Sequence, residues 1–190
     1  MQKKGRRTPD WLELFRKYPK AKILHLQHLK LLTGMKPRTL QVALRRLTQR
    51  KVIRRICRGY YANPFTPPTL EEISAQIYKP SYISLEFALY RHGVLSQAPH
   101  VLTCVTPRLP RTFRTALGTI LYRQIKREFF FGFVREGEYF LAEPEKAFVD
   151  YLYLRRGREI PGTHSEWNDE ELQPQRLRSY AKRLGVKLHR

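Results

Sequence analysis

Apolar residues recur at helical spacing in three segments near the start of the chain. Residues 9–18 and 24–32 each carry a stripe of apolar side chains, and the second stripe stops at Thr33-Gly34, a pair that commonly ends a helix. Pro37 suits the first turn of a third helix, in which apolar residues then recur at i, i+3, i+4 and i+7. The pattern therefore predicts two helices, a turn and a third helix with one buried face.

Two short runs rich in β-branched and aromatic residues follow, at 52–57 and 60–62, and Arg58-Gly59 joins them. They predict a β-hairpin with a basic tip. A helix-turn-helix followed by such a hairpin is typical of a winged helix-turn-helix, in which the third helix is the recognition helix and the hairpin is the wing. We expect this DNA-binding domain to cover residues 1–63.

The rest of the chain alternates helix signals with β-rich runs. A proline-rich stretch at 64–68 cannot continue a helix or a central strand, so we expect a linker there. Residues 69–190 predict a mixed α+β domain, which makes the whole chain α+β. The expected helices begin at Thr69, Ser84 and Pro144, and the expected strands cover residues 101–105, 111–115, 119–124, 129–134 and 139–142. After residue 154 the pattern shows one short amphipathic segment, at 177–184, and it does not indicate which role residues 155–190 have.

Basic residues are concentrated in the first domain. The whole chain has 37 Lys and Arg against 16 Asp and Glu, a formal net charge of +21, and residues 1–63 alone hold 18 basic and two acidic residues. This charge favours a polyanionic partner. The hydrophobic content of 42% excludes a fully disordered basic tail, which lacks enough apolar surface to fold. A winged helix-turn-helix with this charge predicts double-stranded DNA as the partner.

The exposed face of the third predicted helix carries the side chains that contact DNA in such domains. We expect Arg38 and Gln41 to contact base edges in the major groove, with Val42 against a thymine methyl group. Basic side chains of the helix and the hairpin are expected to hold phosphates or to enter the minor groove; these are Lys36, Arg45, Arg54, Arg55 and Arg58. Near the N-terminus, Lys3, Lys4, Arg6 and Arg7 form either a minor-groove arm or a solvated chain end.

Cysteine content and hydropathy indicate in which cellular compartment the protein is expected. Two cysteines, Cys57 and Cys104, are too few for a disulfide framework or a multi-cysteine zinc site, and they allow at most one disulfide bond. No run approaches the roughly 18 apolar residues that a membrane span needs, and the basic N-terminus is not followed by an apolar signal core. We therefore expect a cytoplasmic protein without a membrane partner.

Several separated motifs of the second domain occur in a fixed order. They are Pro80 to Leu85, Ala88-Leu89-Tyr90, His92-Gly93, Thr106, Arg111 to Phe113, Leu117-Gly118, Tyr122-Arg123, Ile125-Lys126, Phe130 to Phe133, Ala142 to Ala147, Asp150 and Leu152-Tyr153-Leu154. Together with the preceding winged helix, this order resembles the AbiEi family of type IV toxin–antitoxin antitoxins, from about residue 24 to residue 154. The resemblance implies an N-terminal domain that represses its own promoter at inverted repeats. It also implies a C-terminal domain that counters a nucleotidyltransferase toxin without a stable complex.

Other non-enzymatic interpretations stay open. One is an RNA-binding or ribosome-binding protein, which exposed stacking of Tyr60, Tyr61 and Phe65 would favour, although we interpret these rings as packing in the wing and linker. Another is an orphan regulator without a toxin, because the second domain is short. A DNA site with two half-sites fits a dimer or two monomers equally well.

A metal-dependent nuclease is the enzymatic alternative. Glu143, Glu145 and Asp150 lie near Lys146, and such nucleases group acidic residues and a lysine around Mg²⁺. The spacing favours acidic residues in the first turn of a helix with Lys146 in a surface pair, because Glu145 and Asp150 do not share a helix face. The sequence has no P-loop, no nucleophile elbow and no dinucleotide fingerprint. We therefore expect no catalytic residues, no metal site and no cofactor.

Overall fold

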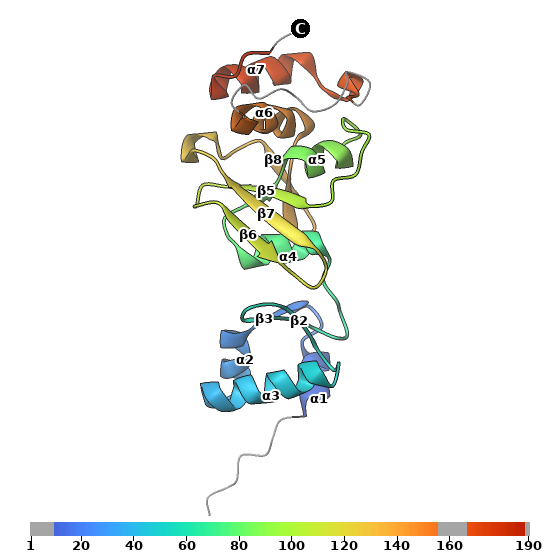
Figure 1. Cartoon of the computed structure of the whole chain (residues 1–190), viewed down its shortest axis with the longest axis vertical. Coiled ribbons are helices and arrows are strands. Elements are labelled where there is room, and N and C mark those ends of the chain that lie inside the picture. The colour runs from blue at the N-terminus through green and yellow to red at the C-terminus, as the bar shows by residue number, and fades with distance from the viewer. Residues whose placement is uncertain (1–9, 156–166, 189–190) are drawn as a thin grey trace, which may run out of the picture. The chain divides into compact units, whose positions relative to one another are not determined.

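The computed structural model describes residues 10–155 and 167–188 (Figure 1). Within these residues the fold is mixed α+β, as expected, with seven α-helices and two β-sheets. The chain divides into two compact units between Thr69 and Leu70. We call the part up to Thr69 unit 1 and the part from Leu70 unit 2. None of the described helices is long and apolar enough to cross a membrane.

Unit 1 combines three helices with a three-stranded antiparallel sheet. The helices are α1 (Trp11–Lys17), α2 (Leu26–Thr33) and α3 (Pro37–Gln49), and the strands are β1 (Ile23–His25), β2 (Arg54–Cys57) and β3 (Tyr60–Ala62). In the sheet, β3 lies between β1 and β2. Helices and sheet share one apolar core, which is made of Trp11, Phe15, Leu24, Leu29, Leu40, Leu44, Ile53 and Tyr61.

Local chemistry determines the turn between α2 and α3. Gly34 ends α2 in the left-handed conformation, at φ 61°, which a residue without Cβ adopts without strain. The Thr33 hydroxyl donates to the Leu29 carbonyl at 2.7 Å and accepts from the Met35 amide at 3.3 Å. Pro37 then opens α3, where no intrahelical N–H bond is lost. The expected helix, turn and helix are therefore present.

The second helix begins later than its apolar stripe predicts. The stripe starts at residue 24, but Ile23–His25 forms β1 and pairs with Tyr60–Ala62. Pairing with this distant strand satisfies backbone groups that a helix would otherwise have satisfied. His25 then caps α2, because its Nδ1 accepts a hydrogen bond from the Gln27 amide at 3.3 Å. The predicted strand at 52–57 is also shorter in the structure and begins at Arg54.

Asn63 connects the end of β3 to the end of α1. It is fully buried, and its Nδ2 donates to the carbonyl oxygens of Phe15 and Tyr18, each at 3.1 Å. Its Oδ1 accepts from the Phe65 amide at 3.0 Å. The Phe65 ring lies 5.0 Å from the guanidinium carbon of Arg16. The predicted linker thus begins against unit 1, and residues 64–69 form neither helix nor strand.

Unit 2 is built on a six-stranded mixed sheet (Figure 1). In chain order its strands are β4 (Tyr82–Ile83), β5 (Leu102–Thr106), β6 (Arg111–Arg114), β7 (Thr119–Gln124), β8 (Phe133–Glu136) and β9 (Tyr139–Ala142). Their spatial order is β6-β7-β5-β4-β9-β8. The pairs β5–β7 and β4–β9 are parallel, and the other neighbours are antiparallel. The expected hairpins β6–β7 and β8–β9 therefore belong to one sheet.

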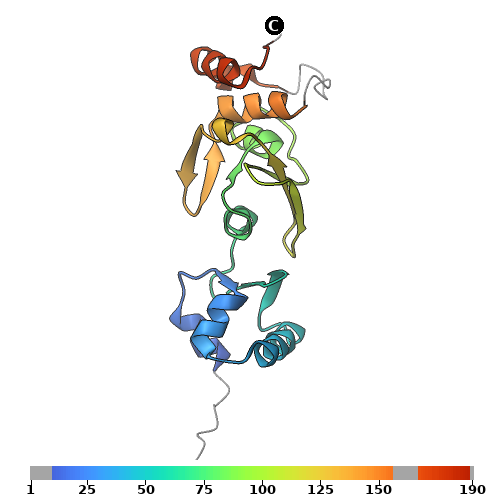
Figure 2. The same cartoon turned by 90° about the vertical axis from the view of Figure 1, so that its left-hand side faces the viewer.

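Helices cover both faces of this sheet (Figure 2). They are α4 (Leu70–Ile77), α5 (Leu85–Arg91), α6 (Pro144–Arg155) and α7 (Pro174–Leu184), with short 3₁₀ turns at Arg127–Phe129 and Asp169–Glu171. On one face, the Tyr122 hydroxyl of β7 donates to the Ser74 carbonyl of α4 at 2.7 Å. On the other face, the Phe87 amide of α5 donates to the Thr103 hydroxyl of β5 at 3.2 Å. Helix α6 packs on α5, and α7 packs on α6.

The structure differs from the sequence-based prediction in two strands of unit 2. The strand predicted at residues 129–134 begins later in the structure, because a 3₁₀ turn ends at Phe129 and β8 begins only at Phe133. The aromatic run packs instead: the rings of Phe130 and Phe133 lie 5.1 and 4.6 Å from the Tyr82 ring. Strand β4 was not expected, and Ile83 pairs with residues of β5 and β9 that are far away in the sequence.

Candidate nucleic-acid interface

Helix α3 turns one face to the core of unit 1 and the other to solvent. Leu40 and Leu44 are fully buried, and Arg38, Gln41 and Arg45 lie on the exposed side. The eight residues predicted to contact DNA are all exposed; they are Lys36, Arg38, Gln41, Val42, Arg45, Arg54, Arg55 and Arg58. Val42 is the apolar member, with 45% of its surface accessible. The basic residues at positions 3, 4, 6 and 7 lie outside the described residues.

A groove of about 630 Å³ lies between α3 and the turn that joins β2 to β3. It brings together four of the eight predicted residues, namely Gln41, Arg45, Arg55 and Arg58. The other four, Lys36, Arg38, Val42 and Arg54, do not line it. We call this feature the α3 groove. Its remaining polar walls come from residues that were not predicted, which are His25, Gln27, Thr48 and Gln49.

Some of the groove residues that were not predicted could have been found from the sequence, and others could not. Thr48 and Gln49 continue the exposed stripe of α3 one turn beyond Arg45, so helical periodicity alone includes them. Gln27 belongs to the start of α2, and only the folded arrangement places it beside the other residues. That arrangement is fixed by a backbone hydrogen bond of 2.8 Å from the Leu26 amide to the Gly59 carbonyl. The bond ties the β2–β3 turn to the first turn of α2.

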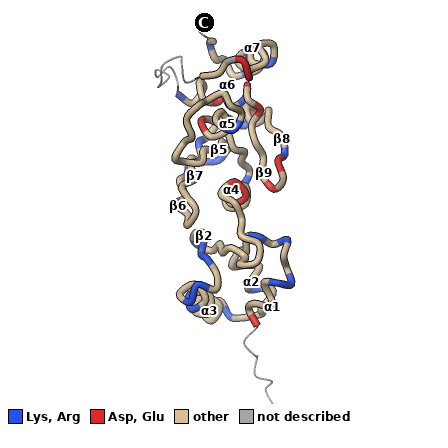
Figure 3. The backbone as a smooth tube through the Cα atoms, turned by 90° about the vertical axis from the view of Figure 1, so that its right-hand side faces the viewer, with Lys and Arg blue, Asp and Glu red and all other residues tan. Residues whose placement is uncertain are grey.

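The basic side chains around the groove have no carboxylate nearby. Among all its lining residues there is neither Asp nor Glu. Arg45, Arg55 and Arg58 form no ion pair with any described residue, and the Nε of Arg55 donates to the Cys57 carbonyl at 3.3 Å. The acidic residues of unit 1 are confined to the start of α1 (Figure 3). Positive charge is therefore free to act on an anion in the α3 groove.

Both cysteines are free thiols, Cys57 in unit 1 and Cys104 in unit 2. Burial raises the pKa of the Cys57 thiol, and the charge of Arg55 partly opposes this effect. Burial in the sheet raises the pKa of the Cys104 thiol to about 12. Both thiols are therefore protonated at neutral pH, which disfavours nucleophilic chemistry at either position.

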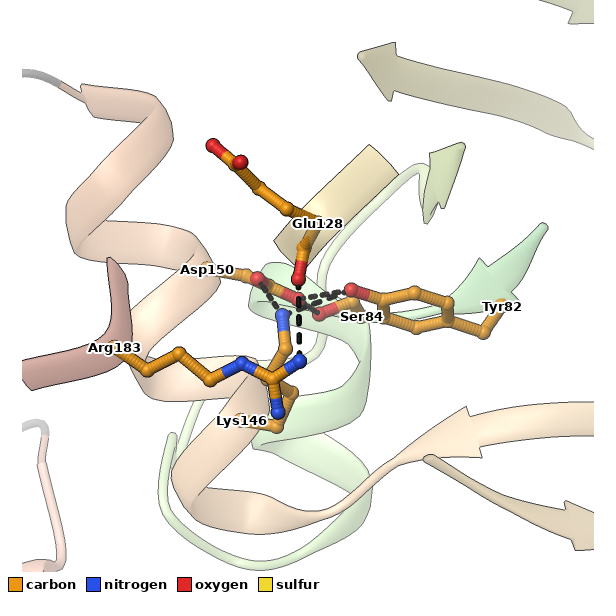
Figure 4. A network of polar contacts seen from close by, with 6 residues as sticks. All are labelled: Tyr82, Ser84, Glu128, Lys146, Asp150 and Arg183. Atoms are coloured by element: carbon orange, nitrogen blue, oxygen red, sulfur yellow. Dashed lines mark hydrogen bonds and ion pairs between the residues drawn. The ribbon is translucent and has the colours of Figure 1, made fainter. Parts of the chain in front are cut away.

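The interpretation of Lys146 as part of a surface pair is wrong. Its side chain is fully buried in unit 2, where the ammonium group contacts the Asp150 carboxylate and donates to the Tyr82 hydroxyl at 2.9 Å (Figure 4). Asp150 also accepts from the hydroxyls of Tyr82 and Ser84, at 2.8 and 2.9 Å. A lysine is stable in such a place only with a charged partner and further hydrogen bonds, and this one has both. We call these four residues the buried network.

Burial dominates the ionisation of the buried network. It lowers the pKa of Lys146 and raises the pKa of Asp150, and in each case the other member of the pair opposes the shift. The pKa of Tyr82 lies well above its usual value, first through burial and then through the neighbouring Asp150 charge. Both oxygens of Asp150 thus have partners within the buried network.

The other acidic residues near the start of α6 also have partners. The carboxylate of Glu145 is almost fully buried and accepts from the Gln173 amide at 2.8 Å, at the start of α7. Glu143 accepts from the Tyr180 hydroxyl at 2.5 Å. Within the part of the chain that the structure describes, no group of three His, Cys, Asp or Glu side chains is placed to hold a metal ion. Arg176 of α7 lies 3.7 Å from both Glu143 and Glu145, whereas Asp150 is held in the buried network, so each of the three carboxylates considered for a nuclease has a protein partner.

Comparison of the sequence with protein-family models gives no match, and comparison with curated proteins gives none either.

Proposed function

We propose that this protein is a double-stranded-DNA-binding transcriptional repressor and that unit 1 is a winged helix-turn-helix. The α3 groove is the observation that carries the proposal. It joins the exposed face of one helix to a basic β-turn, and amide and guanidinium groups line it without any carboxylate. Amide and guanidinium groups are the side chains that recognise base edges and phosphates.

In this proposal α3 and the β2–β3 turn contact different parts of the DNA. Arg38 and Gln41 lie in the first turns of α3, the part of a recognition helix that contacts base edges. Arg55 and Arg58 lie on the wing and contact phosphates, which sets register and contributes most of the salt dependence. Val42, which is half exposed beside Gln41, contacts a thymine methyl group.

We further propose that the protein is the antitoxin of a type IV toxin–antitoxin system, that it is cytoplasmic and that it is not an enzyme. The support is the resemblance of residues 24–154 to the AbiEi family, and the α+β fold of unit 2 agrees with it at a coarse level. The engaged carboxylates of α6 also disfavour the nuclease alternative. In this role the protein represses its own promoter at inverted repeats, as a monomer or a dimer, and counters a nucleotidyltransferase toxin without a stable complex.

The DNA-binding proposal is tested by titrating the full chain with its own upstream region, a scrambled duplex and a matched RNA, each at two salt concentrations. Repression predicts the tightest binding to the upstream duplex and the smallest loss of affinity at the higher salt. Equal affinity for all three, lost together as salt rises, would reduce unit 1 to a nonspecific polyanion binder. Preference for the RNA would support the RNA-binding alternative instead.

The antitoxin proposal has a separate test. The first step is to establish whether the neighbouring reading frame encodes a nucleotidyltransferase. If it does, the chain is expressed together with that enzyme, and growth is compared with expression of the enzyme alone. Rescue of growth, without co-purification of the two proteins, supports the proposal. Failure of rescue while operator binding is intact leaves a regulator without antitoxin activity.

A further inference from the structure

Unit 2 contains a cleft of about 630 Å³ that is separate from the α3 groove. Residues of β5, β7, α5 and α6 line it. Helices α5 and α6 lie on the same face of the sheet (Figures 1 and 2). Leu121 of β7 lines its floor, and Leu85 of α5 and Tyr151 of α6 line its walls. Its volume falls within the range of roughly 300–1,000 Å³ that is usual for small-molecule sites. We call it the sheet cleft.

The inner surface of the sheet cleft is mainly apolar. Leu85, Leu121 and Tyr151 supply carbon surface, and the Thr103 hydroxyl on the floor is already engaged. That hydroxyl donates to the Ser84 carbonyl at 2.6 Å and accepts from the Phe87 amide at 3.2 Å. The floor therefore suits an apolar ring better than a polar group.

The rim of the cleft carries positive charge. Arg123 of β7 is exposed and forms no ion pair with any described residue. Arg155, at the end of α6, lies 3.9 Å from the Glu86 carboxylate, and its guanidinium carbon lies 4.4 Å from the centre of the Tyr151 ring. Glu86 pairs with Arg155, whereas no described carboxylate pairs with Arg123, whose charge can act on an anion. A guanidinium group binds phosphate through two parallel hydrogen bonds.

Backbone strain occurs at the wall of the same cleft. Leu85 is buried and has φ 60°, a left-handed conformation that a branched apolar residue rarely adopts. The neighbouring Ser84 side chain is held by the carboxylate of Asp150 in the buried network. Strained residues of this kind persist where the surrounding structure holds them, and they gather at ligand sites.

We propose that the sheet cleft binds a nucleotide, with the base against Leu85, Leu121 and Tyr151 and the phosphate on Arg123. The apolar floor accounts for the ring, and the unpaired guanidinium at the rim accounts for the phosphate. The nucleotide is either free or the end of a strand, since both present the same base and phosphate. This site lies in unit 2 and does not depend on the DNA-binding function proposed for unit 1.

The test is calorimetric titration of the full chain with a nucleoside monophosphate, the matching nucleoside, inorganic phosphate and a short oligonucleotide. Saturable binding of the monophosphate, with clearly weaker binding of the nucleoside and of phosphate, supports the site. If the oligonucleotide binds more tightly than the monophosphate, the source is a strand end; the reverse order indicates a free nucleotide. The proposal is overturned if neither the monophosphate nor the oligonucleotide gives saturable binding. It is also overturned if inorganic phosphate binds as tightly as the monophosphate.

Variants locate the binding in the cleft. Arg123→Gln should lower the affinity for the monophosphate by about tenfold or more, because a charged hydrogen bond is lost. Arg114→Gln is the matched control, since Arg114 is exposed on the same sheet but does not line the cleft. Leu121→Glu places a carboxylate on the floor and should abolish binding, with circular dichroism as the check on folding. Equal losses in Arg123→Gln and Arg114→Gln would contradict the site, and operator binding measured in parallel keeps the two proposals distinguishable.

Discussion

The ammonium group of Lys146 and the carboxylate of Asp150 form an ion pair one helical turn apart on α6, and neither side chain is exposed to solvent. Tyr82 and Ser84 complete the hydrogen bonding of this pair from a segment more than 60 residues earlier in the chain. The pair therefore links helix α6 to β4, a central strand of the sheet of unit 2 (Figure 4).

Removing one charge of this pair should strongly destabilise unit 2. Asp150→Asn and Lys146→Met should each lower the free energy of unfolding by about 3–5 kcal/mol, because each leaves an uncompensated buried charge. The double variant Lys146→Met/Asp150→Asn should lose less stability than the sum of the two single losses. Trp11→Phe makes Trp167 the one remaining tryptophan, so its fluorescence follows urea unfolding of unit 2. Additive losses would show that the two charges do not interact.

The Lys146 side chain packs directly against the backbone of Gly132, which has no Cβ. Gly132 has φ 71°, and a Cβ added there would lie 2.9 Å from Cγ of Lys146. Gly132→Ala should therefore destabilise unit 2 through both backbone strain and the clash, by about 2–3 kcal/mol. Gly137→Ala is the matched control, because Gly137 has φ 57° but nothing lies within 4 Å of the added atom. Equal unfolding midpoints for the two variants would argue against the close contact.

Two tyrosines should make unit 2 sensitive to alkali. Burial raises the pKa of Tyr180 to about 12, and its hydrogen bond to Glu143 adds to this effect. The pKa of Tyr139 is also raised to about 12, first by burial and then by the hydrogen bond and the charge of Glu136. Between the ordinary value of 10.0 and 12 the folded state keeps protons that the unfolded state releases, so the free energy of unfolding should fall as pH rises through this window.

Phenolate absorbance during an alkaline titration checks this prediction. Tyr180→Phe and Tyr139→Phe should each remove one group from the part of the curve near pH 12. Glu143→Gln should move the titration of Tyr180 to lower pH, because the carboxylate that disfavours the phenolate is gone. A curve that is unchanged in all three variants would refute the assignment.

Single substitutions in unit 1 should separate recognition of bases from recognition of phosphates. Arg38→Ala or Gln41→Ala should relax preference at one base pair by about 1–3 kcal/mol. Arg58→Ala should weaken all duplexes alike and reduce the slope of log K against log salt by about 0.9. Lys17→Ala, in the last turn of α1, removes the same charge away from the α3 groove and serves as the control. If Arg38→Ala changed neither affinity nor preference, α3 would not be the recognition helix.

Sequence patterns predicted the elements of this protein that depend on neighbouring residues. The stripe of α3 places Leu40 and Leu44 inside and the predicted DNA-contacting side chains outside, and its start follows from Pro37. The hairpin β6–β7 was likewise visible as two β-rich runs about a short turn. These features follow from helical or strand periodicity and from turn residues, which act over a few positions.

Features that depend on distant partners were missed. The two residues of β4 are too few to give a pattern, and they form a strand only because β5 and β9 flank them. β1 replaced the start of a predicted helix for the same reason, since its partner β3 follows more than 30 residues later. Four of the eight residues predicted to contact DNA line the α3 groove. Of its lining residues, Gln41 and Arg45 share a helix face, whereas Gln27 joins them only in the fold.

The sequence by itself determined that the chain is α+β, that its positive charge gathers in the first third and which face of α3 is solvent-exposed, because composition and periodicity are local properties. Only the tertiary structure decided that Lys146 is buried. A lysine in a sequence predicts an exposed charge, since burial without a partner costs too much. Here Asp150 lies one helical turn away from Lys146. Tyr82 on a distant strand and Ser84 before a distant helix complete the hydrogen bonding of the pair. No pattern along the chain shows this arrangement.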